Sequence, residues 1–295
     1  MRIVEKNPII MIVLGVIGIS LSSIFVKYAQ APSAVTAAYR LLWTVVLMTP
    51  FVFGKKTVRR ELLATTAKMA FLSCISGVFL AMHFVLWFES LQHTSVASST
   101  TIVCTEVVWV AFGFYLLLKG KFRWNTLLAI GISLMGSILI TYSDSGSDSH
   151  LYGDILALLA AMAVAVYTLI GRVVRSNVST AVYTYMVYTA CAVVLVIACV
   201  VGGYGLFDYG LSPVIVGLLL SVFSTLLGHS IFSWCLKYFS PAFVSASKLC
   251  EPVVAAVLAG FLFSEVPGWL QILGSLLILG GVYYYSVMET KQQKA

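Results

Sequence analysis

The chain has 295 residues, of which 60% are apolar and only 10% are charged, and its mean hydropathy is +1.00. In an ordinary soluble domain roughly a quarter of the residues are charged, so this composition excludes a soluble fold. A spanning helix needs about 20 apolar residues, which leaves room for about ten crossings with short loops. The sequence therefore predicts an all-α, polytopic membrane protein.

Ten apolar runs follow one another along the chain and are the predicted transmembrane helices. Most prolines lie at or near run ends, where a missing backbone N–H is harmless, and only Pro252 lies deep within a run. The first run resembles a signal peptide ending at Ala29-Gln30-Ala31, but it exceeds the usual roughly 7–15 apolar residues, so we expect it to be retained. The runs span about 8–28, 33–54, 68–90, 94–118, 124–143, 151–172, 180–203, 212–236, 241–263 and 267–288.

Basic residues predict the orientation of these helices. Of the 18 lysines and arginines, 15 lie in the termini and in the even-numbered gaps between runs. The odd-numbered gaps carry one cation, Lys27, and several acids, among them Glu89 and Asp208. By the positive-inside rule, both termini are expected in the cytoplasm. The net charge of +7 thus reflects membrane topology, and we expect no nucleic-acid partner.

The six cysteines all lie inside or at the edges of the apolar runs and form no C-x-x-C pair. Cysteines in such places behave as small buried hydrophobes. We therefore predict no disulfide framework, no metal site and no cofactor.

The chain also repeats itself at an offset of 145 or 146 residues. The matches predict two homologous five-helix halves, 1–146 and 147–295. Because five is odd, the second half must cross the membrane in the opposite sense, as in the inverted repeats of alternating-access transporters, whose substrate site lies near the midplane. The matching pairs are Lys27 and Arg172, Trp124 and Trp269, Glu106 and Glu251, Ser33 and Ser179, Tyr39 and Tyr185, and His83 and His229.

Several ionisable residues lie inside the apolar runs. A charge near the bilayer centre costs about 2.5–3.5 kcal/mol, so these side chains are expected to face the bundle interior. Lys248 and Glu251 are three residues apart, within reach of an ion pair on one helix face. Pro252 follows, and it removes a backbone hydrogen bond and predicts a hinge. A neutralised pair that locks this helix in place is the structural alternative.

Glu106 has no basic residue three positions before it, so its partner is Arg40, Lys248, a histidine or a proton. A proton would suit a coupling role, and a hydrogen bond to a neighbouring helix is the alternative. Arg40 could clamp a carboxylate or phosphate of a substrate, or pair with Glu106.

The remaining candidates are His83, His229 and three aromatic residues, Tyr39, Trp43 and Trp109. Two histidines without a third ligand do not make a metal site, which leaves buried structural histidines or a proton relay. The predicted substrate-binding set is Arg40, Glu106, Trp109, Lys248, Glu251, Tyr39, Trp43, His83 and His229. For the aromatic residues, core packing or lipid contact is the alternative.

Three segments of the chain resemble the drug/metabolite transporter superfamily, specifically its ten-helix EamA-type members. They run from His83 to Ser99, from Leu151 to Arg172, and from Ser240 through Glu251-Pro252 and Glu265. The resemblance covers essentially the whole chain. It implies a secondary transporter of the cell membrane, an exporter of a small polar metabolite such as an amino acid or a related compound. The oligomeric state is expected to be a monomer or a homodimer.

One departure from the family pattern lies in the fourth run, where Glu106-Val107 replaces a Gln-Pro or similar pair. A fourth helix without proline is expected to bend less than the ninth.

Two other functions are alternatives. One is a flippase for an amphiphilic or lipid-linked substrate. The other is an intramembrane enzyme, against which the chain has no HxxE, DxxD or GxSxG pattern.

Overall fold

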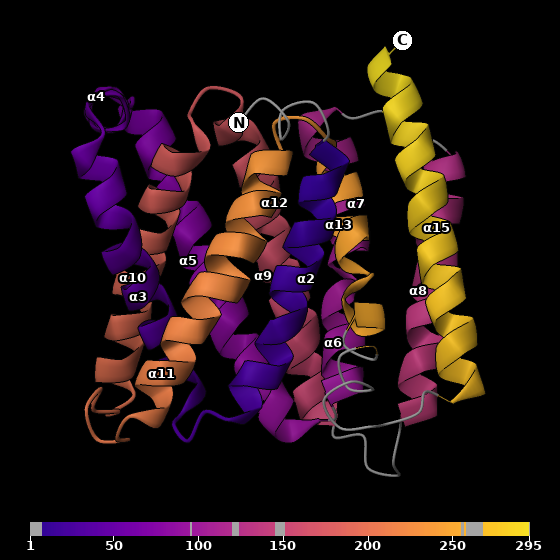
Figure 1. Cartoon of the computed structure of the whole chain (residues 1–295), viewed down its shortest axis with the longest axis horizontal. Coiled ribbons are helices and arrows are strands. Elements are labelled where there is room, and N and C mark those ends of the chain that lie inside the picture. Colours follow the sequence, from indigo (N-terminus) through magenta and orange to yellow (C-terminus); the bar gives the residue numbers. More distant parts are fainter. Residues whose placement is uncertain are drawn as a thin grey trace.

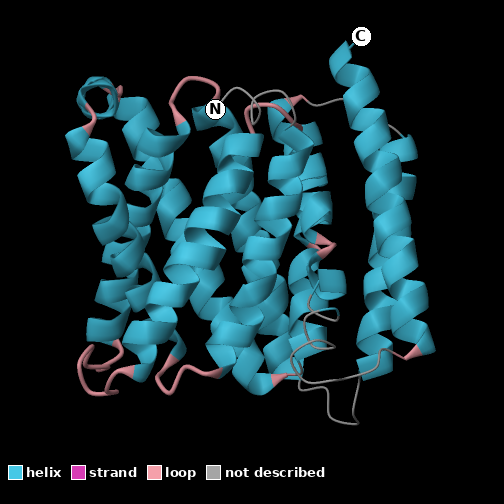
Figure 2. Ribbon diagram, viewed as in Figure 1, coloured by secondary structure: helices cyan, strands magenta, loops and turns pink. Residues whose placement is uncertain are grey.

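The computed structural model describes residues 8–94, 96–119, 124–144, 151–254, 257 and 268–294. Over these residues the chain is helical, without strands, and its loops lie mostly at the two ends of the bundle (Figure 2). Hydrocarbon offers backbone groups no partners, so apolar runs satisfy them within helices. Seven described helices are long and apolar enough to span a membrane, and two shorter apolar helices are Trp124–Ile140 and Ile272–Met288.

The helices follow the predicted runs closely. The first five runs form α2 (Pro8–Lys27), α3 (Ser33–Gly54), α5 (Ala67–His93), the pair α6 (Val96–Cys104) and α7 (Glu106–Leu118), and α8 (Trp124–Asp144). A short helix, α4 (Lys56–Ala64), precedes α5. The later runs form α9 (Leu151–Arg175), α10 (Thr180–Val201), the series α11 (Ser212–Leu219), η1 (Leu220–His229) and α12 (Ser230–Cys235), α13 (Pro241–Lys248), and α15 (Trp269–Lys294).

The ninth run begins as α13, where Ser240 caps the helix by accepting a hydrogen bond from the Phe243 N–H (3.2 Å) and Pro241 occupies the first turn. Most of its residues beyond Val254, Glu265 among them, lie outside the described residues. The all-α, multi-span architecture is thus confirmed, while ten crossings and inverted halves stay predictions.

The fourth run, expected to bend less than the ninth for lack of a proline, is interrupted as well. At Thr105 the N–H bonds the Ile102 carbonyl (3.0 Å), and the Thr105 hydroxyl donates to the same oxygen (2.6 Å). A threonine hydroxyl that competes for a backbone carbonyl can therefore interrupt a helix without proline. In the ninth run the break falls at Leu249 and Cys250, just before Pro252.

The helices of the two predicted halves are interleaved. The most extensive contacts join α5 to α9, α8 to α15, α10 to both α5 and α3, and α2 to η1, and each of these pairs crosses between the halves. Two separate apolar cores result. The first core lies mainly among α3, α5, α9 and α10, and the second among α2, α7, α8, α12, α13 and α15. The α8–α15 pair forms one edge of the bundle (Figure 1).

Candidate functional site

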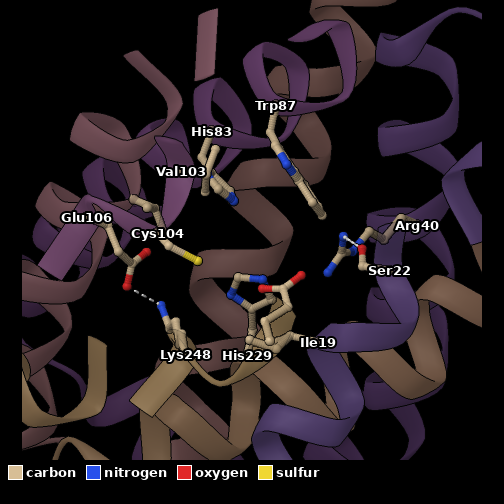
Figure 3. Close-up of a pocket in the computed structure, with 12 residues that line it drawn as sticks. Ile19, Ser22, Arg40, His83, Trp87, Val103, Cys104, Glu106, His229 and Lys248 are labelled. Carbon is tan, nitrogen blue, oxygen red and sulfur yellow. Dashed lines mark hydrogen bonds and ion pairs between the residues drawn. The ribbon is translucent and has the colours of Figure 1, made fainter. Parts of the chain in front are cut away.

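A cavity of about 40 Å³ lies inside the bundle and is lined from both cores. This volume holds about three water molecules, since each needs roughly 10–15 Å³. Figure 3 shows polar side chains from several helices around the cavity. The lining residues are Ile19, Ser22, Arg40, His83, Trp87, Val103, Cys104, Glu106, Val164, His229, Lys248 and Glu251.

An ion pair joins the two interrupted helices at this cavity. Lys248 Nζ lies 2.8 Å from Glu106 Oε1, and the two side chains are only 10% and 4% exposed (Figure 3). Lys248 is the last residue of α13, and Glu106 is the first residue of α7. Each charge therefore lies at the helix end whose dipole favours it.

This pairing corrects the predicted ion pair between Lys248 and Glu251. The i, i+3 geometry needs a continuous helix between the two residues. The turn at Leu249 and Cys250 interrupts that helix, and Lys248 instead contacts the acid of the facing helix. Of the four partners that the sequence allowed for Glu106, the structure shows Lys248.

Glu251 lines the same cavity but has a different environment. It opens the helical segment after the break, it is 9% exposed, and Pro252 beside it is buried. Its Oε1 atom is buried without a hydrogen-bond partner among the described residues. Leaving a buried polar group unsatisfied is costly, so such an atom marks a place where a ligand or a proton would be stabilised.

Arg40 is fully buried on α3, and its hydrogen-bond partners are neutral. Its Nε donates to Thr225 Oγ1 (2.7 Å) and its Nη1 donates to Ser22 Oγ (3.2 Å). The guanidinium also lies over the Phe84 ring at 4.1 Å. Thr225 belongs to the π-helix η1, a type of helix that is frequent at functional sites. The structure thus shows hydroxyl partners for Arg40 in place of the considered pair with Glu106.

His83 and His229 meet across the cavity, with ring centroids 6.3 Å apart. His83 Nδ1 lies 3.0 Å from the Ala160 carbonyl oxygen, which can only accept, so this nitrogen donates. Trp87 stacks on His83 one turn along α5, and its Nε1 atom is buried without a hydrogen-bond partner in the described part of the chain.

Three predicted site residues do not line the cavity. Tyr39 Oη donates to the Leu206 carbonyl (2.9 Å), and Trp43 Nε1 donates to the Val214 carbonyl (3.1 Å). Both bonds tie α3 to the segment around α11. Trp109 packs against a small apolar cluster of Val110, Ala165 and Leu169. These contacts match the packing alternative for the aromatic residues.

The cavity also contains residues that the predicted set lacked, and the repeat offset points from the predicted set to one of them. Eight of the lining residues form four pairs at the separations of the sequence repeat. Ile19 and Val164, Val103 and Lys248, and Glu106 and Glu251 are 145 apart, and His83 and His229 are 146 apart. Applying the offset to Lys248 would have indicated Val103. No comparable signal in the sequence indicates Ser22 and Thr225, the partners of Arg40.

A known protein family matches this chain in two segments. The EamA-like transporter family matches residues 6–142 and again residues 151–287. The chain belongs to the EamA-like transporter family. This EamA-like protein is therefore a multi-pass membrane transporter of the drug/metabolite type, not an enzyme.

Individual relatives of this EamA-like transporter agree with the assignment. A Clostridium kluyveri protein named "Uncharacterized transporter" is 24% identical over 267 residues, which cover 88% of this chain and 85% of the relative. The mouse protein "Solute carrier family 35 member G1" is 25% identical over 280 residues, with 88% and 73% covered. A crystal structure with 14% identity superposes with a TM-score of 0.79, covers 97% of this chain and 99% of the other, and supports the fold alone.

Proposed function

We propose that this transporter is a secondary exporter of a small polar metabolite, such as an amino acid or a related compound, that works by alternating access. It would reside in the cell membrane as a monomer or homodimer, with both termini in the cytoplasm. The observation that carries the proposal is the unpartnered carboxylate oxygen of Glu251 in a buried, charged cavity. Intramembrane ionisable groups of this kind usually mark substrate or ion pathways.

The charges around the cavity support a substrate that carries both signs. Among the described residues, Arg40 is bonded only to neutral side chains, and it offers a cationic donor for a carboxylate. Glu251 offers an acceptor for an ammonium group, and Trp87 Nε1 offers a further donor. The paired Lys248 and Glu106 already neutralise each other. We therefore assign substrate contact first to Arg40 and Glu251.

The size of the cavity supports a conformational cycle. A space for about three waters is too small for an amino acid, so the helices around it must separate to admit one. The two breaks, at Thr105 and at Leu249–Cys250, lie at equivalent positions of the sequence repeat and offer matching hinges, the second with Pro252 beside it. Because helices of the two halves are interleaved, we propose that the moving bodies are the two cores rather than the two halves.

Proton coupling belongs to the same proposal, with Glu251 as the exchanging group. Glu106 was the first candidate from sequence, but its carboxylate is held by Lys248. Glu251 could bind a proton in one state and the substrate's cation in the other. The titratable or charged groups facing it around the cavity are Arg40, His83, Cys104, Glu106, His229 and Lys248. A transport rate that is unaffected by an imposed pH gradient would contradict this part of the proposal.

A flippase is the second candidate within the same superfamily. It would need an apolar lateral opening for an acyl or isoprenoid chain. Four charged side chains line this cavity, which favours a soluble polar substrate over an amphiphile.

The proposal is tested with purified protein reconstituted into vesicles. A thermal-shift screen of amino acids, amines and carboxylic acids first finds a ligand, because binding to the folded state raises apparent stability. Transport of that ligand is then compared between the wild type and Glu251→Gln, which keeps the size of the side chain. We expect Glu251→Gln to lose both transport and the thermal shift, and Lys248→Ala to lose transport.

The matched control is Glu89→Gln, which changes an acid of α5 that bonds His93 outside the cavity (3.1 Å). This variant should transport at the wild-type rate. Wild-type transport by both Glu251→Gln and Lys248→Ala would remove the cavity from consideration as the substrate site.

A further inference from the structure

The short helix α4 crosses the end of the bundle instead of running along it. Figure 1 shows α4 end-on while α3 and α5 run up the view, at the same end as the start of α2 and the end of α15. A helix in this orientation next to spanning helices lies in the plane of the membrane interface. Its sequence, KTVRRELLA, has too few apolar residues to span.

The inner face of α4 fixes it to the protein. Val58 and Leu62 pack against the first core. Glu61 Oε1 accepts a hydrogen bond from the backbone N–H of Ser179 (2.6 Å), the residue that caps α10. A carboxylate at a helix N-terminus is favoured by the helix dipole. The one acid of α4 is therefore occupied by the docking contact.

The outer face of α4 is strongly basic. Lys55, Lys56, Arg59, Arg60 and Lys68 are exposed, and none of them forms an ion pair within the described part of the chain.

Arginines elsewhere at this end of the bundle are used differently. Arg172 donates to the carbonyls of Leu236 and Phe239, and Arg175 donates to the Ser233 carbonyl (3.0 Å). Lys55 lies over the Phe51 ring at 4.2 Å. The other cations of this face have no ion-pair partner within the described part of the chain and can bind an external partner.

Apolar side chains at the same level indicate what that partner is. Leu63 on α4 is 77% exposed, and Phe51 and Phe53 in the last turns of α3 are each 44% exposed. Exposed apolar groups beside a basic helix are typical of a segment at the boundary between headgroups and acyl chains. A water-soluble partner would not explain why the apolar side chain of Leu63 is exposed.

We propose that the basic face of α4 is a binding site for anionic phospholipid headgroups of the surrounding bilayer. The guanidinium groups of Arg59 and Arg60 can bind a phosphodiester through paired hydrogen bonds. The ammonium groups of Lys55 and Lys56 add attraction to an anionic leaflet. The bound lipid would hold α4 down on the start of α10, and the site is independent of the transported substrate.

The test measures binding of phosphatidylglycerol to the intact protein in detergent, by native mass spectrometry and by thermal shift. The test variant is Lys56→Gln/Arg59→Gln/Arg60→Gln. The matched control, Lys119→Gln/Lys237→Gln/Lys291→Gln, removes three exposed cations that lie at or just after the C-terminal ends of α7, α12 and α15 and are not clustered in sequence. All six positions are exposed, so both variants should keep the wild-type melting temperature in neutral lipid.

We expect the test variant to weaken phosphatidylglycerol binding on the order of a hundredfold, from the loss of three clustered cations, and the control to bind like the wild type. Equal losses in both variants would overturn the proposal, because they would show a general surface-charge effect. Stabilisation by inorganic phosphate alone as strong as that by phosphatidylglycerol would also overturn it, since a free anion would then suffice.

Discussion

The pair of Lys248 and Glu106 lets the energetics of the site be tested residue by residue. Breaking a buried ion pair by removing one partner typically costs about 3–5 kcal/mol, because an unpaired charge is left behind. Lys248→Met leaves two acids, Glu106 and Glu251, in one cavity. Glu106→Gln leaves the charge of Lys248 without its partner, but the cavity still holds an opposite charge, Glu251, three residues away in sequence. We therefore expect Lys248→Met to be the more destabilising change, near the upper end of that range.

The double variant Lys248→Met/Glu106→Gln should lose less stability than the sum of the two single variants, because neither charge is left buried without the other. Chemical unfolding in detergent micelles measures all four proteins as a double-mutant cycle. Additive losses in the double variant would contradict a direct interaction between the two side chains.

At the scale of single residues, the sequence predicted several residues that line the cavity better than it predicted their partners. Intramembrane charges stand out in an apolar run, so Arg40, Glu106, Lys248 and Glu251 could be found without a structure. Their partners depend on neighbouring helices, which no local spacing encodes. Ser22 and Thr225, which hold Arg40, are ordinary residues in sequence and become informative only through a 3.2 Å and a 2.7 Å contact.

At the scale of helices, α8 and α15 approach each other through glycines. A Cβ added at Gly136 would lie 2.5 Å from the Gly274 carbonyl oxygen, and one added at Gly274 would lie 2.6 Å from the Gly136 oxygen. In lipid, small residues are what permit such close approach. The contact is reciprocal between the fifth and tenth predicted runs.

We expect Gly136→Ala to destabilise the transporter by about 1–3 kcal/mol, the usual cost of overpacking, because backbone atoms must move. Gly131→Ala on the same helix is the control, since nothing lies within 4 Å of its added Cβ. Alanine also has the higher helix propensity, so the control should be unchanged or more stable. Unfolding by increasing detergent strength compares the two, and equal stability would contradict the close packing of α8 on α15.

The extents of the elements were largely predictable and their interruptions were not. Apart from the end of the ninth run, which lies outside the described residues, and the end of α15, which extends to Lys294 instead of 288, the apolar runs place the helix ends within a few residues of those observed. The turn at Thr105 and the π-helix Leu220–His229 depend on side-chain hydrogen bonds inside the bundle. The prolines therefore predicted the break beside Pro252 in the ninth run but not the break at Thr105 in the fourth run.

At the scale of the whole molecule, the orientation in the membrane can be tested. The distribution of basic residues predicts that α4 and both termini lie in the cytoplasm. In a variant without the two partly accessible cysteines, Cys74 and Cys250, a single cysteine introduced as Asp208→Cys should react with an impermeant maleimide on intact cells. Lys56→Cys should react only after permeabilisation. Both positions are exposed, and labelling of Lys56→Cys in intact cells would reverse the proposed orientation.

An apolar composition, ten spaced runs and segments typical of the EamA type can be read locally along the chain, so they were enough to predict a helical membrane transporter. Which charges meet depends on how the helices pack against one another. The interleaving of the two halves brings Lys248 to Glu106 and, among the described residues, leaves the Oε1 atom of Glu251 without a hydrogen-bond partner. The physical reason is that hydropathy and charge asymmetry act along the chain, whereas a buried ion pair forms between helices far apart in sequence.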